Sequence, residues 1–172
     1  ILNLVYIARS LGLVKVADYW EQILIINKHQ RERFANKIKT LINKNSLIKS
    51  VSILGWAFKK DTNDTRESAA IYVSDSLIRS DISVNVYDPK VKESQILFDI
   101  NHINENYTEN NEHVSIYNDP IESVDKTNII AILTEWDEFK DYNWKKIFDK
   151  MNKPAYIYDG RNILEKEKLE SI

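Results

Sequence analysis

Residues 51–68 constrain the fold of this chain most, because they join a buried strand, a tight turn, a charged loop and a helix. The apolar run at 51–54 ends at Gly55, and the loop that follows carries lysines, aspartates and an arginine. An amphipathic helix is predicted over about 65–80. An open α/β sheet builds a ligand site in this way, at the carboxyl end of a strand. We therefore expect a ligand to bind over the loop that begins at Gly55.

This loop lacks the glycines with which a dinucleotide fold admits a pyrophosphate. Gly55 is followed by Trp56, Ala57 and Phe58, and the pattern Gly-x-Gly-x-x-Gly does not occur. Side chains of this size keep a pyrophosphate from lying against bare backbone. We therefore predict that side chains reaching out from the loop hold the ligand. The paired lysines after Phe58 suit a diphosphate, although a solvated loop surface is the alternative.

Strands and helices are predicted to alternate along the rest of the chain. The expected strands are 51–54, 83–87, 114–117, 128–133 and 155–158, and the expected helices are about 65–80, 92–99, 119–125, 136–150 and 162–169, with a polar surface excursion before residue 113. Such alternation is typical of a parallel sheet with helices on both faces. We predict an α/β fold whose Rossmann-like sheet is open and mostly parallel, preceded by a long helix.

The first part of the chain is predicted to be entirely helical. A short helix over 1–11 ends with Gly12 just beyond it, and apolar residues then recur at helical spacing from about 15 to 44. A single helix of this length is about 45 Å long. It should therefore project, bridge two domains or pair with another subunit. Two ordinary helices with a kink near Asn27 are the alternative.

We divide the chain into a central helical segment, residues 1–46, and a ligand-binding domain, residues 47–172. The long helix is expected to leave an apolar stripe uncovered, and a stripe of this kind favours self-association. Its expected members are Trp20, Ile23, Leu24 and Phe34. We therefore predict a homo-oligomer formed through the helical segment.

Composition excludes several classes of function. The 172 residues, 43% of them hydrophobic, suffice for one core and a short annex. The net charge is −2 and the two signs are mixed along the chain, so we expect neither nucleic acid nor a membrane as partner. The absence of cysteine fits a reducing, cytoplasmic setting. The three histidines lack metal-ligand spacing, and no Ser-His-Asp constellation occurs, so we predict no metal site and no catalytic residue in the chain.

Collinear blocks along nearly the whole chain resemble the C-terminal part of the UDP-glucose/GDP-mannose dehydrogenase family, most strongly its animal and plant members that act on UDP-glucose. These blocks are LNLVYI (2–7), VSILGWAFKKDTNDTRES (51–68), VYDPKV (86–91), LTEWDEF (133–139) and KPAYIYDGRN (153–162). The resemblance implies a protein that oxidises UDP-glucose to UDP-glucuronate in two hydride transfers to NAD. It also implies a separate NAD-binding domain and a cysteine nucleophile, both upstream of Ile1. We therefore expect this chain alone to be inactive.

The same resemblance implies roles for four residues. Phe58, Lys59 and Arg161 match family residues that contact the UDP-sugar, and Arg66 matches an arginine that reaches the NAD of the neighbouring domain. From the bare sequence, Arg161 is equally well an exposed residue of a turn, because it follows a strand and a glycine. The cations themselves suit phosphate oxygens.

Other residues of the matched blocks have structural interpretations. Asp64 and Glu67 have capping-box spacing and are expected to begin the helix over about 65–80. Asp88 ends the second expected strand, where a dinucleotide fold places a ribose-binding acid. Without the glycine fingerprint we interpret Asp88 as a turn residue. The segment 134–136 is expected to begin a helix and to form a pocket wall.

Two alternatives to an enzyme acting on UDP-glucose stay open at this point. A dehydrogenase for another UDP- or GDP-sugar would share these blocks, since the sugar pocket is expected mostly upstream. A non-catalytic module that binds nucleotide-sugars or assembles with other proteins would need none of the upstream chemistry. The parent reading frame distinguishes them, because an upstream cysteine loop and dinucleotide fingerprint would rule out the module.

Overall fold

The core of the fold is a sheet of parallel strands. The computed structural model describes residues 1–103 and 111–172, and within them the strands are β1 (Ser50–Leu54), β2 (Ser83–Tyr87), β3 (Val114–Tyr117), β4 (Ile129–Ile132) and β5 (Tyr156–Asp159). They pair in the order β3-β2-β1-β4-β5, and each neighbouring pair is parallel. The predicted Rossmann-like parallel sheet is confirmed, with the first strand at its centre.

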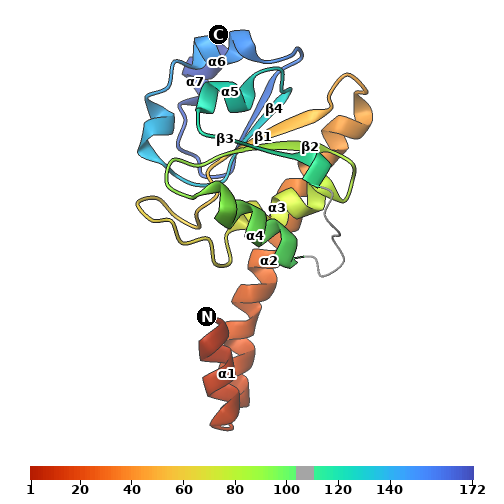
Figure 1. Ribbon diagram of the computed structural model, residues 1–172. Helices are drawn as coiled ribbons and strands as arrows, with labels where there is room; N and C mark the ends of the chain where they lie inside the picture. The colour runs from red at the N-terminus through yellow and green to blue at the C-terminus, as the bar shows by residue number, and fades with distance from the viewer. Residues whose placement is uncertain (104–110) are drawn as a thin grey trace.

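Helices cover both faces of this sheet. They are α1 (Leu2–Ser10), α2 (Val14–Lys44), α3 (Ala69–Ile78), α4 (Glu93–Ile103), α5 (Pro120–Val124), α6 (Trp144–Lys150) and α7 (Lys166–Glu170), with the 3-10 turns η1 (Asn111–His113) and η2 (Asp137–Lys140). Right-handed crossovers put α3 and α4 on one face, and the return across the sheet puts α5 and α6 on the other. Figure 1 shows this arrangement, with the end of α2 on the side of α3.

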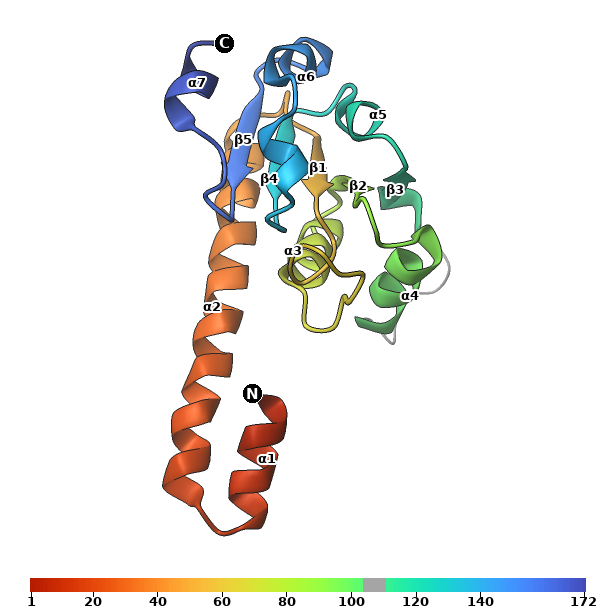
Figure 2. The same cartoon turned by 90° about the vertical axis from the view of Figure 1, so that its left-hand side faces the viewer.

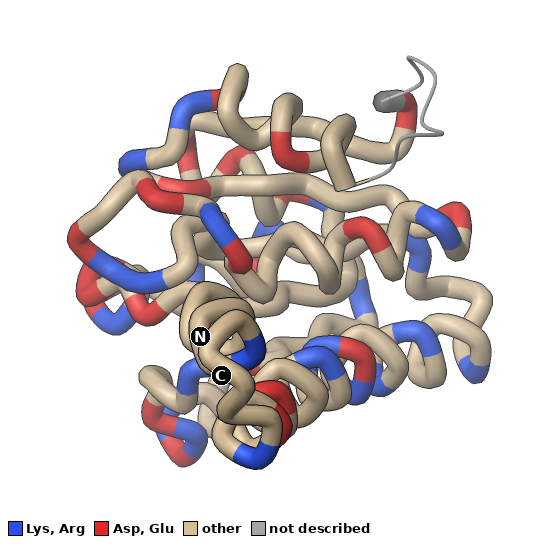
Figure 3. Tube along the Cα trace, turned by 90° about the horizontal axis from the view of Figure 1, so that it is seen from below, with Lys and Arg blue, Asp and Glu red and all other residues tan. Residues whose placement is uncertain are grey.

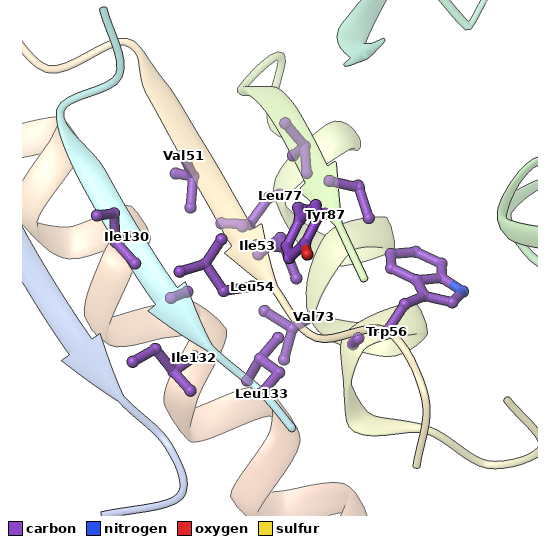
Figure 4. Packing of buried hydrophobic residues seen from close by; sticks show 14 of the residues in the cluster. Val51, Ile53, Leu54, Trp56, Val73, Leu77, Tyr87, Ile130, Ile132 and Leu133 are labelled. Carbon is purple, nitrogen blue, oxygen red and sulfur yellow. The ribbon is translucent and has the colours of Figure 1, made fainter. Parts of the chain in front are cut away.

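The two central strands are buried on both sides. All four residues of β4 and the last four of β1 are buried, as is typical of parallel strands covered by helices. Their side chains pack with Val73 and Leu77 of α3, and with Tyr87 at the end of β2 (Figure 4). The rigid centre of the domain therefore lies directly beneath the carboxyl ends of β1 and β4.

The long helix α2 is unbroken and has two different environments. Helix α2 has 31 residues, so the alternative of a kink near Asn27 is wrong. Its C-terminal half buries Ala35 and Ile38 against the domain, whereas its N-terminal half projects away with α1 folded back along it (Figure 2). An ion pair between Arg9 and Glu21, at 2.6 Å, joins the two helices.

The expected apolar stripe on α2 is only half exposed. Trp20 and Leu24 pack against a small cluster with α1, and Phe34 packs edge-to-face on Tyr158 with ring centroids 6.1 Å apart. The exposed apolar residues of the projecting half are different ones, and they include Tyr6, Ile7, Val16, Tyr19, Ile25 and Ile26. The prediction of which side chains are uncovered was therefore wrong, because α1 covers part of the expected stripe.

The start of α3 also differs from the prediction. The helix begins at Ala69, where the Ser68 hydroxyl caps it by accepting the Ala70 N–H. Glu67 has a left-handed backbone, with φ of 58°, which no helix interior tolerates. The predicted capping box of Asp64 and Glu67 is therefore wrong.

Other boundaries moved by a few residues. The helices expected near 136–150 are η2 and α6, the helix over 162–169 is shortened to α7, and the one over 92–99 extends through α4. Most of the expected surface excursion before residue 113 lies outside the described residues.

Charges of both signs occur along most of the described helices and loops, as Figure 3 shows. The C-terminal half of α2 is the exception, because residues 28–44 carry six Lys or Arg residues and one Glu. No helix within residues 1–103 or 111–172 is both long and apolar enough to cross a bilayer.

Candidate functional site

The carboxyl ends of three strands lie at one level of the sheet. Leu54 of β1 pairs with Ile132 of β4, which pairs with Asp159 of β5. The three arrows end at the same edge in Figure 2. The chain continues from β1 toward β2 on one side and reaches β4 only after crossing back, so the β1–β4 boundary is the topological switch point. The loops that leave β1, β4 and β5 therefore share one ligand-binding edge.

Gly55 allows the first of these loops to leave the sheet. Its φ is +92°, and a Cβ added there would lie 2.4 Å from the Cβ of Thr134. The hydroxyl of Thr134 then donates to the Ala57 main-chain oxygen at 2.5 Å. Gly55 is thus required both for its left-handed backbone and for the close approach of the β4 loop.

Arg161 lies across the switch point. Its Nε donates to the Leu133 main-chain oxygen at 2.7 Å, and its Nη2 donates to the Phe58 main-chain oxygen at 3.3 Å. Gly160 permits this position, since a Cβ there would lie 2.8 Å from the Ile132 oxygen. The guanidinium is partly covered, with 33% of the side chain exposed. Arg161 is thus an exposed residue whose guanidinium is hydrogen-bonded to two main-chain oxygens.

Phe58 and Lys59 lie at the open side of the same loop. Both side chains are exposed, and the Lys59 Nζ lies 5.3 Å from the centre of the Phe58 ring. The Phe58 N–H donates to the Asp64 main-chain oxygen at 3.0 Å, which closes the loop behind them. The structure thus brings the predicted residues Phe58 and Arg161 into direct contact, with Lys59 next to them in the chain.

Glu135 is a residue of this site for which we predicted no such role. Its Oε1 accepts the Lys60 main-chain N–H at 3.3 Å, and its Oε2 lies 3.4 Å from the Arg161 Nε. One carboxylate therefore ties the loop after β1 to the guanidinium. The sequence placed Glu135 after an expected strand, in the segment 134–136 expected to begin a helix and to form a pocket wall. Neither expectation reveals partners far away in the chain.

The charges beside Glu135 are paired. The Lys60 ammonium lies 2.5 Å from Asp137, which also pairs with Lys140 at 2.6 Å. Hydrogen bonds from Lys140 and then Lys60 lower the pKa of Asp137 to about 2. Of the two adjacent lysines, Lys60 is thus held by a carboxylate. No ion pair is found for Lys59 within the described residues.

Arg66 lies on the outer side of the loop and is 88% exposed. Its guanidinium binds Asp64 through Nε and Nη2, at 2.9 and 2.6 Å. These bonds lower the pKa of Asp64 to about 2. No contact joins Arg66 to Arg161 in the described structure, so the fourth predicted residue stands apart from the other three. Its exposure leaves other guanidinium N–H groups facing outward.

Asp88 has a larger role than the predicted turn. The turn itself is confirmed, because Oδ1 accepts the N–H groups of Lys90 and Val91, both at 2.9 Å. In addition, Oδ2 accepts the N–H groups of Trp56 and Ala57 in the loop after β1, at 2.6 and 3.0 Å. The side chain that begins one loop therefore shapes the neighbouring one.

This arrangement is suited to binding an anionic ligand. Lys59 and Arg161 offer N–H donors at an open edge, and an aromatic ring lies beside them. Such cations bind phosphate oxygens by charge-assisted hydrogen bonds. Among the described residues, no group of three His, Asp or Glu side chains is placed to hold a metal ion.

A family model and several known proteins match this chain. Residues 52–166 match the model of the UDP-glucose/GDP-mannose dehydrogenase family, UDP binding domain. The chain is 44% identical to UDP-glucose 6-dehydrogenase of Drosophila melanogaster, with the match covering 100% of this chain and 37% of that protein. It is 43% identical to UDP-glucose 6-dehydrogenase 4 of Arabidopsis thaliana, covering 100% of this chain and 38% of that protein. The chain therefore spans little more than a third of these relatives.

Solved structures share the fold. A UDP-glucose dehydrogenase from the archaeon Pyrobaculum islandicum aligns over 96% of this chain and 33% of its own, with a TM-score of 0.66 and 22% identity. A UDP-D-ManNAc dehydrogenase from Pyrococcus horikoshii aligns over 90% of this chain and 31% of its own, with a TM-score of 0.61 and 26% identity. These neighbours include the long helix and the parallel sheet together, since each alignment covers nine-tenths or more of the chain.

Proposed function

This chain belongs to the UDP-glucose/GDP-mannose dehydrogenase family, and from that membership we propose that it is the UDP-sugar-binding part of an NAD-dependent UDP-glucose 6-dehydrogenase. The whole protein would oxidise UDP-glucose to UDP-glucuronate in two hydride transfers. The observation that carries the proposal is the hydrogen bond between Arg161 and the Phe58 main chain at the switch point. It holds together the two loops from which the proposed ligand residues extend.

The diphosphate of the ligand would bind between Lys59 and Arg161. Arg161 uses Nε and Nη2 for main-chain oxygens, which aims the guanidinium. No partner of its Nη1 is found among the described residues, so Nη1 could donate to a phosphate oxygen. Lys59 supplies a second, mobile ammonium at the exposed end of the loop. The Phe58 ring, 37% exposed, would pack against an apolar part of the ligand. In this proposal the chain binds and orients the substrate.

Arg66 would face the cofactor. NAD, when bound by the neighbouring domain of the complete protein, accepts the hydride from the substrate. The Arg66 side chain fits such a role because it is exposed and its Asp64 partner occupies only Nε and Nη2. Its Nη1 would donate to the cofactor across the cleft. Replacing Arg66 with alanine in the complete protein should raise the NAD concentration needed for half-maximal rate and leave UDP-glucose binding nearly unchanged.

We further propose that residues 1–46 join this domain to the NAD-binding domain and to a second subunit, whereas residues 47–172 bind the ligand. The support is the projecting half of α2 with α1, which displays exposed apolar side chains such as Tyr19, Ile25 and Ile26. A homo-oligomer would bury them. A cytoplasmic location fits the absence of cysteine. Sedimentation of the chain over a range of concentrations measures the oligomer directly.

Calorimetric titration with UDP tests the binding role. We expect UDP to bind the chain, and GDP to bind at least about tenfold more weakly if the nucleotide is selected. Stronger binding of GDP would favour a GDP-sugar dehydrogenase instead. For the complete protein, NAD reduction with UDP-glucose separates an enzyme from a non-catalytic binding module. Binding of neither nucleotide would contradict the proposed site.

A further inference from the structure

The Asp88 carboxylate is surrounded by N–H groups. Five of them point at its two oxygens: the main-chain groups of Trp56, Ala57, Lys90 and Val91, and the indole Nε1 of Trp136. The distances run from 2.6 Å for Trp56 to 3.1 Å for Trp136. A carboxylate is an acceptor-only group with about four lone-pair sites on its two oxygens, so it suits such a cluster of donors as a bound anion would.

This cluster of donors is enclosed. Asp88 is 8% exposed, Trp136 is 5% exposed and Trp56 is fully buried. Trp56 lies just beyond the end of β1 (Figure 4), and its own indole N–H donates to Asp99 at 2.9 Å. The low exposure of all three residues therefore leaves water little access to the carboxylate and its donors.

Two of these donors lie in the loop after β1, where dinucleotide-binding folds bind phosphate. In a parallel sheet of this order, the loop after the first strand is where backbone N–H groups meet the phosphates of a dinucleotide. Here the N–H groups of Trp56 and Ala57, the first two residues after Gly55, already donate to Asp88. Asp88 follows the second strand, where the dinucleotide fold places an acid that points outward to the ribose. In this chain that acid points inward.

We propose that Asp88 is a built-in anion that occupies the phosphate-binding position of the loop after β1. By taking the N–H groups of Trp56 and Ala57, it excludes a ligand phosphate from the backbone. It also fixes the two residues that precede Phe58 and Lys59. The ligand therefore contacts the side chains of the outer part of the loop and not its main-chain N–H groups. Asp88 is thus a positioning residue that determines which class of nucleotide the edge accepts.

A role confined to the local turn does not account for this geometry. The turn uses only Oδ1, through Lys90 and Val91. The second oxygen reaches residues 32 and 31 positions earlier in the chain. It also accepts the Trp136 indole, 48 positions later, so that one oxygen links the loops after β1 and β4.

Chemical rescue of Asp88→Ala by formate tests the proposal. The substitution removes the carboxylate and leaves its donors converging on a space of the size of formate. We expect the folded form of the variant to bind formate. At a formate concentration ten times the dissociation constant, the equilibrium constant for unfolding should fall about elevenfold. The unfolding of the parent chain should not respond, and sodium chloride at equal ionic strength provides the blank.

Two further variants control for general effects of the salt. Asp88→Asn fills the space with an amide, so formate should not rescue it. Asp119→Ala also removes a carboxylate that accepts two main-chain N–H groups, those of Ile121 and Glu122, but these are exposed to water at the start of α5. Formate should therefore leave Asp119→Ala unchanged. Equal stabilisation of all three variants would overturn the proposal.

Failure of Asp88→Ala to fold does not prevent the test. The folded fraction is then measured as formate is added, and no recovery at saturating formate counts against a built-in anion. The affinity of Asp88→Ala for UDP should be lower than that of the parent and should recover with formate. This last measurement rests on the proposed function, whereas the rescue of folding involves no nucleotide. The two proposals can therefore fail separately.

Discussion

The guanidinium of Arg161 donates to the main-chain oxygen of Phe58 across 103 residues of sequence, with Nη2 and the oxygen 3.3 Å apart. This bond joins the end of β5 to the loop after β1, over the strand β4 that separates them in the sheet. The residue proposed to bind the diphosphate is therefore also one that holds the loop bearing Lys59. Arg161 and Lys59 should consequently respond differently to substitution.

Replacing Arg161 with alanine should reduce both ligand binding and stability. Loss of one charge-assisted contact to the diphosphate should weaken UDP binding about tenfold to a hundredfold. Loss of the bonds to Leu133 and Phe58 should lower the free energy of unfolding by about 1–2 kcal/mol. Calorimetry and urea unfolding measure the two effects. Arg161→Lys keeps the positive charge but lacks the planar guanidinium and its paired N–H donors, so it should recover part of the affinity at most. Binding of UDP by Arg161→Ala with the affinity of the parent would refute the site.

Replacing Lys59 with alanine should reduce ligand binding alone. Its side chain is exposed and lies over the Phe58 ring, and it fills no part of the core. We expect UDP binding to weaken about tenfold to a hundredfold, with the free energy of unfolding changed by less than about 0.5 kcal/mol. The matched control is Lys60→Ala, because Lys60 is held by Asp137 and should matter less for UDP. A larger loss of affinity from Lys60→Ala would reverse the assignment.

Replacing Gly55 with alanine should destabilise the domain far more than the same change at Gly12. Both glycines have a left-handed backbone, with φ of +92° and +72°. At Gly12 nothing lies within 4 Å of an added Cβ, so only the backbone strain of about 1–2 kcal/mol is expected. At Gly55 the clash with Thr134 adds to it, for a total of about 2–5 kcal/mol. If thermal unfolding showed the same loss of stability in both variants, the loop after β4 would be able to move away from the added Cβ without an energetic penalty.

The ion pair of Asp64 with Arg66 should make a contribution to stability that is lost in acid. Its hydrogen bonds lower the pKa of Asp64 from about 4 to about 2 in the folded chain. A lowered pKa stabilises the folded state at pH values above about 4, and this contribution disappears as the pH falls toward about 2. The difference in unfolding free energy between the parent and Asp64→Asn should shrink over that interval. Because Arg66 is largely exposed, the difference should be small and should decrease with added salt.

In Arg66→Ala the largest cause of the lowered Asp64 pKa, the side-chain hydrogen bonds, is removed, whereas the main-chain N–H of residue 66 can still donate to Asp64. The pKa of Asp64, followed by NMR titration of its carboxyl carbon, should then return toward its ordinary value of about 4. An unchanged pKa in this variant would show that another group sets it. The main-chain N–H of residue 66 is the first alternative, and the Lys59 ammonium, which lowers this pKa least, is the second.

The sequence alone determined the architecture of this protein. Short apolar runs alternate with segments of helical periodicity, and this alternation predicted a parallel sheet. Strands buried between two layers of helices must be apolar throughout, as 51–54 and 129–132 are. Gly55 was identified because a sharp turn after a buried strand requires a residue without a Cβ. Phe58, Lys59 and Arg161 were placed at strand ends by the same local pattern, and parallel topology alone brings such ends to one edge.

Tertiary structure alone decided which groups those residues meet. Asp88 turned inward because its donors, Trp56 and Trp136, come from two loops that are remote in sequence. Ser68 rather than Asp64 began α3, and Glu67, with its left-handed backbone, pairs with Arg31 of the distant helix α2. Local propensity acts over a few residues, whereas these outcomes depend on contacts between segments that become neighbours only when the sheet is complete.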